Sequence, residues 1–226
     1  MKILVKICGI SEPKSLEIVC EEGADFIGFV FFQKSPRNVN LETAKKLRKL
    51  VTPTAQCKIV ALFVDQDDAF IQNVLEEIDP DFIQLHGNHS LDRVAFIRSE
   101  FRKPIIKAHS VFSKDDVQDG LSYLSPGVIA DIILFDAKPT QPTVLPGGNG
   151  LQFDWRILSA ISGKYPFALA GGLNPDNVVQ AIHSTGAHMV DVSSGVETAP
   201  GQKDPELIRR FIRNAKSVTS NLWKNS

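Results

Sequence analysis

Residues 3–13, ILVKICGISEP, join an apolar strand to a short turn and the start of an expected helix. A doubly wound open sheet usually carries a G-x-G-x-x-G fingerprint after its first strand, and this turn has none. The same stretch puts Cys8 at the carboxyl end of the strand beside Gly9, which is where a parallel α/β barrel places catalytic groups. A buried packing cysteine is the alternative interpretation of that position.

The pattern of this first unit recurs along the chain. Short β-branched or aromatic runs alternate with segments of helical periodicity. The expected strands cover residues 3–8, 25–31, 58–64, 82–85, 104–108, 131–135, 166–170 and 188–193. Parallel neighbours need crossover helices, and eight such units close into a ring. The sequence therefore predicts the α/β class, as a single (β/α)8 TIM barrel domain over residues 1–226.

Capping residues predict where several helices begin. Asn174-Pro175-Asp176 and Asp204-Pro205-Glu206 each combine a capping side chain, a proline for the first helical position and an acid for the first turn. Asp67 or Asp68 and Ser90 are weaker caps of the same kind. One apolar stripe is expected to face the core and consists of Phe70, Ile71, Val74, Leu75 and Ile78.

Composition excludes several classes of protein. A net charge of −1 argues against nucleic acid or an acidic membrane as a partner. A basic cluster alternates with apolar residues and is interpreted as the solvent-exposed face of an amphipathic helix; it consists of Lys45, Lys46, Arg48 and Lys49. No apolar run approaches the ~20 residues of a membrane span, and Lys6 interrupts the N-terminal run that a signal peptide would need. The cysteines Cys8, Cys20 and Cys57 lack metal-type spacing and indicate reduced thiols, so we expect a cytoplasmic protein without a bound metal.

Two glycine-containing turns predict an anion site. Gly171-Gly172 follows the seventh expected strand, and Ser194-Gly195 follows the eighth. Backbone N–H groups of such turns are unpaired donors, and the loops after strands seven and eight hold a phosphate in many barrels. The alternative is that these glycines only permit tight turns. Gly148, in the long segment after the sixth strand, is a further candidate for phosphate contact or for a hinge.

Other polar side chains lie at the same ends of the expected strands. His86 is placed to touch a substrate, whereas the H-x-x-H spacing that it forms with His89 lacks further ligands for a metal. Asp191 is expected to face the barrel interior, where a carboxylate needs a partner. Arg37 across the barrel mouth and a substrate hydroxyl are the two candidates for that partner.

These motifs resemble one enzyme family along most of the chain. Lys6-Ile7-Cys8-Gly9, Ser35-Pro36-Arg37, Gln84-Leu85-His86-Gly87, Leu134-Phe135-Asp136, Ala170-Gly171-Gly172-Leu173 and the run from Asp191 to Glu197 are similar to phosphoribosylanthranilate isomerase of tryptophan biosynthesis. The match runs from residue 3 to about residue 204. The resemblance implies a cofactor-free barrel that converts N-(5-phosphoribosyl)anthranilate into 1-(2-carboxyphenylamino)-1-deoxyribulose 5-phosphate by an Amadori rearrangement.

The resemblance also implies roles for particular residues. Asp136 would be the general acid and Cys8 the general base, while Arg37 would hold the anthranilate carboxylate. Such chemistry requires a raised pKa for Asp136 and a lowered or supported pKa for Cys8. The chain departs from the family pattern at Ala137-Lys138 and at Asn149, which affects loop contacts only. The expected partner is a small phosphoribosyl substrate, and the oligomeric state stays open between a monomer and a homodimer.

Two other functions fit parts of the pattern. The histidine-pathway isomerase performs the same rearrangement on a larger bis-phosphate, usually with two aspartates, so Cys8 and a single convincing phosphate end argue against it. A non-catalytic phosphosugar-binding barrel would need neither Cys8 nor Asp136.

Overall fold

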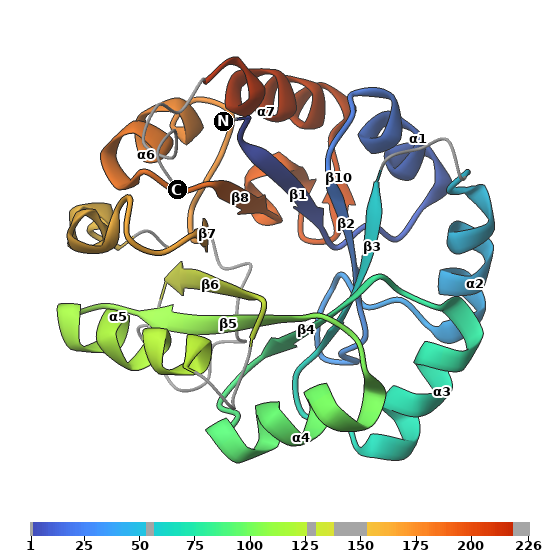
Figure 1. Ribbon diagram of the computed structural model, residues 1–226. Coiled ribbons are helices and arrows are strands. Elements are labelled where there is room, and N and C mark those ends of the chain that lie inside the picture. The colour runs from blue at the N-terminus through green and yellow to red at the C-terminus, as the bar shows by residue number, and fades with distance from the viewer. Residues whose placement is uncertain (1, 53–56, 126–129, 138–152, 219–226) are drawn as a thin grey trace.

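A closed ring of parallel strands forms the centre of the protein (Figure 1). The computed structural model describes residues 2–52, 57–125, 130–137 and 153–218. β1 pairs with both β2 and β8, which closes the barrel and confirms the predicted fold class. The strands are β1 (Leu4–Cys8), β2 (Phe26–Val30), β3 (Lys58–Phe63), β4 (Phe82–His86), β5 (Ile105–Val111), β6 (Ile132–Ala137), β7 (Phe167–Leu169) and β8 (Met189–Val192).

Helices surround this ring on its outside (Figure 1). They are α1 (Pro13–Glu21), α2 (Leu41–Leu50), α3 (Asp68–Ile78), α4 (Leu91–Phe101), α5 (Lys114–Leu121), α6 (Val178–Thr185) and α7 (Pro205–Ser217). Three short 3₁₀ helices are η1 (Ser122–Leu124), η2 (Trp155–Ile161) and η3 (Ser194–Val196). The expectation of an α-helix in every unit was wrong for the described residues between β6 and β7, where η2 packs against α6 instead.

Two of the predicted helix starts have different outcomes. Asp204 accepts hydrogen bonds from the backbone N–H groups of Glu206 and Leu207, so α7 begins at Pro205 as expected. Asn174 instead caps a turn, because its side chain accepts from Asp176 N at 2.9 Å, and α6 begins only at Val178. The capped turn at Asp204-Pro205 therefore continues directly as a helix, whereas the capped turn at Asn174-Pro175 does not.

Hydrophobic residues fill two layers, one between the strands and the helices and one inside the ring. The inner layer consists of Phe26, Val60, Ile106, Ala108, Leu134, Ala168, Ala170 and Met189. The predicted stripe on α3 is buried at Ile71, Val74, Leu75 and Ile78, but Phe70 is 40% exposed and that assignment was wrong. The charged side chains of Lys6 on β1 and Asp191 on β8 are buried as well, so the barrel is not apolar throughout.

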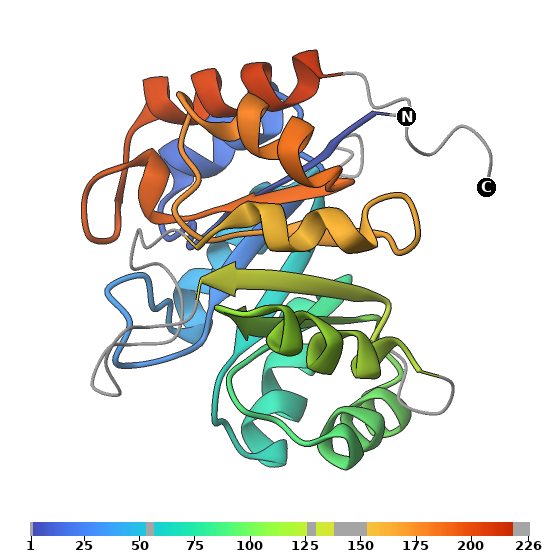
Figure 2. The ribbon, with the colours of Figure 1, turned by 90° about the vertical axis from the view of Figure 1, so that its left-hand side faces the viewer.

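A short hairpin that the sequence analysis missed follows β8. It consists of β9 (Glu197–Ala199) and β10 (Gln202–Lys203), joined at Gly201, whose φ is 82°. A Cβ at Gly201 would lie 2.4 Å from the carbonyl oxygen of Pro36, so the hairpin packs directly on the loop after β2. A side view of the barrel shows this hairpin and that loop at the same end, toward which the strand arrows point (Figure 2).

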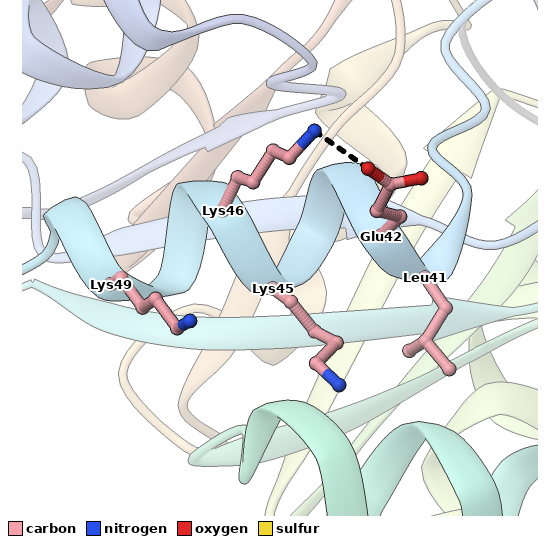
Figure 3. Close-up of a pocket in the computed structure, with 5 residues that line it drawn as sticks. All are labelled: Leu41, Glu42, Lys45, Lys46 and Lys49. Carbon is pink, nitrogen blue, oxygen red and sulfur yellow. Dashed lines mark hydrogen bonds and ion pairs between the residues drawn. The ribbon is translucent and has the colours of Figure 1, made fainter.

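The basic cluster lies on the outer face of α2, as predicted. Figure 3 shows Lys45, Lys46 and Lys49 projecting from this helix, where they line a pocket together with Leu41 and Glu42. Lys46 pairs with Glu42 at 2.7 Å, and Lys45 pairs with Glu77 of α3. Lys45 and Lys46 therefore have ion-pair partners at the surface, and none of the expected site residues lines the pocket.

Candidate active site

Cys8 is the last residue of β1, and its side chain points into the mouth of the barrel. The residue is 5% exposed and packs with Val30, Phe32 and Leu62. Its neighbour in β2 is Gly28, at which a Cβ would lie 2.9 Å from Cys8 Sγ. A side chain at position 28 would therefore displace the thiol. The structure confirms that Cys8 lies at the carboxyl end of its strand.

A buried ion pair lies immediately beneath this thiol. Lys6 Nζ donates to Asp191 Oδ1 at 2.9 Å, and both residues are at least nine-tenths buried. The two residues are register neighbours on β1 and β8. Of the two expected partners of Asp191, Arg37 was wrong, because the adjacent strand supplies a closer cation and Arg37 pairs with Glu197. A contact between Asp191 and a substrate hydroxyl stays a prediction. The alternation of Lys6 with Cys8 along one strand was the available signal, since both must face the same side.

Asp136 lies on β6 and is 7% exposed. Its Oδ1 accepts from the backbone N–H of Ala137 at 2.8 Å, and its Oδ2 lies 3.6 Å from His86 Nε2. Burial and the nearby Asp191 carboxylate raise the pKa of Asp136 to about 7. The expected upward shift of this pKa is confirmed, so a large fraction of the carboxyl keeps its proton near neutral pH.

The pKa of Cys8 differs from the expectation. Burial raises the pKa of the thiol above its usual value, and the Asp191 carboxylate adds to this effect. Lys6 and Lys203 act in the opposite direction but do not outweigh burial. The expectation of a lowered value was therefore wrong, because a thiolate loses more hydration in this apolar pocket than two ammonium groups restore.

His86 ends β4 beside Asp136 and is 8% exposed. Burial, together with the charge of Lys107, lowers the pKa of His86 to about 3. The imidazole is therefore neutral at physiological pH and can donate or accept one hydrogen bond at each nitrogen. Its place next to the acid agrees with the predicted substrate contact, which stays a prediction.

Arg37 meets a buried carboxylate that sequence reasoning did not assign. Its Nε and Nη2 donate to the two carboxylate oxygens of Glu197 at 2.8 and 2.7 Å. Lys203 Nζ also donates to Glu197 Oε1 at 2.7 Å, and these two cations lower the pKa of Glu197 although burial opposes them. The hairpin β9–β10 supplies both Glu197 and Lys203. The bidentate contact fixes the orientation of the guanidinium.

Neutralising Glu197 tests whether this contact orients Arg37. We expect Glu197→Gln to raise KM for the substrate about tenfold and to change kcat less than threefold, because a bidentate charge-assisted pair becomes a weaker contact. Steady-state kinetics together with thermal unfolding would separate this effect from a loss of stability. Glu206→Gln, a matched change at an exposed glutamate of α7, should leave KM unchanged. Equal KM values for both variants would contradict the orienting role.

The two predicted phosphate turns lie against each other. A Cβ on Gly195 would lie only 1.8 Å from the carbonyl oxygen of Leu173, which directly follows Gly172. Gly171 and Gly172 have φ values of 85° and 64°, in the left-handed region that favours glycine. Asn177 Nδ2 donates to the Gly172 carbonyl at 2.9 Å and holds the first turn in place. The juxtaposition of the turns, with Ser194 in η3, is therefore confirmed.

Gly171 has a second neighbour that sequence reasoning did not foresee. A Cβ at this position would lie 3.1 Å from Asp136 Oδ1 and 2.7 Å from the Ala137 nitrogen. The turn after β7 thus contacts the acid on β6. The predicted contact of Gly148 lies outside the described residues. Among the residues that the structure describes, no group of three or more histidine, cysteine or acidic side chains could hold a metal ion.

Comparisons with known proteins agree with this geometry. The family model described as N-(5'-phosphoribosyl)anthranilate isomerase matches residues 5–214. The chain belongs to this family. The N-(5'-phosphoribosyl)anthranilate isomerase of Paramagnetospirillum magneticum is 47% identical over 216 residues, which cover 96% of this chain and 98% of that protein.

Solved structures of the isomerase family have the same fold. A crystal structure of the dimeric phosphoribosylanthranilate isomerase from Thermotoga maritima, as mutationally generated monomers, aligns with a TM-score of 0.80 at 33% identity over 96% of this chain and all of that chain. A phosphoribosylanthranilate isomerase in complex with reduced 1-(o-carboxyphenylamino)-1-deoxyribulose 5-phosphate aligns with a TM-score of 0.81 at 33% identity, with the same coverage.

Proposed function

We propose that Asp136 and Cys8 are the acid and the base of the isomerase reaction that family membership assigns to this chain. As a member of the family, the protein is a phosphoribosylanthranilate isomerase of tryptophan biosynthesis. The observation that best supports the two roles is their shared environment. Lys6 and Asp191, which form an ion pair at 2.9 Å, act on the pKa of Cys8 and also on that of Asp136.

The acid acts first. Opening the aminofuranose ring requires a proton on the ring oxygen while the bond between that oxygen and C1 breaks. Asp136 is suited to this step because its raised pKa, at about 7, keeps a transferable proton near neutral pH. The product of the step is an iminium ion between C1 and the anthranilate nitrogen.

The base acts second. The Cys8 thiolate removes the proton from C2, the C–H electron pair becomes a C1–C2 double bond, and the iminium is neutralised to an enolamine. Tautomerisation of the enolamine then gives the ketose. No covalent bond between sulfur and substrate is required.

The two ends of the substrate have separate positions. Arg37, oriented by Glu197, is placed to bind the anthranilate carboxylate. The turns at Gly171-Gly172 and Ser194-Gly195 offer backbone N–H groups for the ribose phosphate. A related isomerase is known in complex with a reduced phosphate-bearing product analogue, which supports a ligand of this class. His86, 3.6 Å from Asp136, and Asp191 are the further candidates for substrate contact.

Cys8→Ala tests the base directly. We expect kcat to fall roughly 10²–10⁴-fold, the usual contribution of a positioned proton-transfer group, with little change in KM. The loss of anthranilate fluorescence from freshly made phosphoribosylanthranilate measures the rate. Cys20→Ala, at a half-buried cysteine of α1, is the matched control and should retain full activity. A Cys8→Ala enzyme with near-normal kcat would rule out this assignment.

We also propose a cytoplasmic setting for this enzyme. Cys8, Cys20 and Cys57 are free, which supports a reducing cytoplasm. None of the helices in the described ranges is long and apolar enough to cross a membrane. The chain works, in this proposal, as one barrel domain, either as a monomer or as a homodimer; the Thermotoga maritima relative is described as dimeric.

A further inference from the structure

We propose that Lys6 is a positioning residue that favours the reactive, thiolate form of Cys8. The inference rests on the proposed role of Cys8 as the base. It adds a residue to the site whose function the reaction itself does not suggest, because Lys6 lies below the thiol and away from the barrel mouth.

The geometry carries this inference. Lys6 is completely buried, its ammonium donates to Asp191 at 2.9 Å, and it interacts electrostatically with the Cys8 thiol. A Cβ on Gly28 would lie 2.9 Å from Cys8 Sγ and 3.1 Å from Lys6 Nζ, so both atoms border the same small space. The absence of a side chain at Gly28 therefore permits the ammonium and the sulfur to approach each other.

The charges around Lys6 explain why it stays an ammonium. Burial acts to lower its pKa, but Asp191 and Cys8 outweigh that effect and the pKa is raised. A buried ammonium is stable only with anionic partners. Asp191 is one such partner, and the thiolate of Cys8 is the second that the same cation can stabilise.

The charged groups that act on Cys8 come from three elements. Lys6 on β1 and Lys203 on β10 favour the thiolate, whereas Asp191 on β8 disfavours it. Lys203 is already paired with Glu197 at 2.7 Å and donates to the Ser193 carbonyl at 2.9 Å. Of the charged groups that favour the thiolate, Lys6 has the largest effect on the pKa of Cys8. It is therefore the dominant cation for this step.

The test measures the thiol without any substrate. A Cys20→Ala/Cys57→Ser background leaves Cys8 as the one cysteine, and its ultraviolet thiolate absorbance gives a titration midpoint. We expect Lys6→Met to raise this midpoint by at least about one pH unit, which is a tenfold smaller thiolate fraction below the midpoint. We expect kcat to fall about tenfold or more, with KM changed less than threefold.

Two further variants provide a test that does not depend on whether Lys6→Met folds. Asp191→Asn removes the anion that disfavours the thiolate, so its midpoint should fall. Lys107→Met removes another buried lysine, on β5, whose ammonium binds the Gly87 carbonyl at 2.8 Å, and it should leave the Cys8 midpoint unchanged. Should Lys6→Met fail to fold, the direction of the shift in Asp191→Asn still decides the proposal.

Each outcome separates this inference from the proposed function. A Lys6→Met midpoint equal to that of the background overturns the role of Lys6, whatever the enzyme's activity. An unchanged or raised midpoint in Asp191→Asn has the same consequence. A shifted midpoint in a background protein that does not isomerise phosphoribosylanthranilate would support the contact between Lys6 and Cys8 and refute the proposed function.

Discussion

Asp136→Asn is expected to inactivate the enzyme and at the same time to stabilise its fold. The loss of the acid should lower kcat roughly 10²–10⁴-fold. The stabilisation has a separate origin, which is the cost of burying an ionised carboxylate. Asparagine has the same shape and carries no charge, so it removes this cost. Its side-chain oxygen can still accept the hydrogen bond from the backbone N–H of Ala137.

The sign of the pH dependence follows from the two states of the protein. The pKa of Asp136 is about 7 when folded, and an unfolded aspartate has a pKa of about 3.9. Between these values the folded state binds more protons, so the wild-type stability falls as pH rises from about 4 to about 7 and then levels off. The full effect is about 4 kcal/mol at pH 8, because the folded and unfolded pKa values differ by about three pH units and each unit corresponds to about 1.4 kcal/mol.

Urea unfolding of both proteins at pH 5 and pH 8 measures this effect. The advantage of Asp136→Asn over wild type should be larger at pH 8 than at pH 5. Asp154→Asn is a control of opposite sign, because Arg156 lowers the pKa of the exposed Asp154. That variant should not gain stability at pH 8. An Asp136→Asn advantage that is equal at both pH values would show that the carboxyl does not titrate near 7.

The second large effect is expected at Gly195. A methyl group there would lie 1.8 Å from the Leu173 carbonyl oxygen, well inside any permitted contact, so one of the two phosphate turns must move. A misplacement of about 1 Å in a substrate-positioning group costs on the order of 10²-fold in rate. We therefore expect Gly195→Ala to lower kcat/KM roughly 10²-fold through KM, with a loss of about 1–3 kcal/mol in stability from overpacking.

A substitution at a second glycine, Gly163, separates the effect on KM from the effect on stability. Gly163, between η2 and β7, has a φ of 71°, and a Cβ there would meet nothing within 4 Å. Gly163→Ala should therefore lose about 1 kcal/mol of stability from backbone strain and keep a normal KM. Competitive inhibition by inorganic phosphate gives an independent measure, and it should weaken only in Gly195→Ala. A normal KM for Gly195→Ala would exclude phosphate binding at these turns.

The hydrophobic periodicity and the polar residues at the strand ends were sufficient to predict much of the fold and of the candidate site. The alternation of strand and helix patterns predicted all eight barrel strands, because a parallel ring is the arrangement that buries both faces of such strands. It also placed Cys8 and Asp136 on one rim. Helix boundaries were less certain where a local turn competes with a helix, as at Asn174, whose side chain binds the next N–H groups in either case.

The partners of the charged residues were beyond the reach of the sequence. Lys6 and Asp191 are 185 residues apart in the chain, and Arg37 and Glu197 are 160 apart. A periodic pattern states which face of a strand a side chain occupies, but not which strand becomes its neighbour across the closed ring.

The protonation state of Cys8 also depends on the tertiary structure, through burial of the thiol. The chemistry of the reaction requires a thiolate, yet burial raises the pKa of Cys8, which packs against Val30 and Phe32 at the end of β2 and against Leu62 of β3. The sequence by itself determined the barrel, the rim and the residue types on it. Only the tertiary structure decided which charges meet, since desolvation and Coulomb interactions depend on distances that ring closure creates.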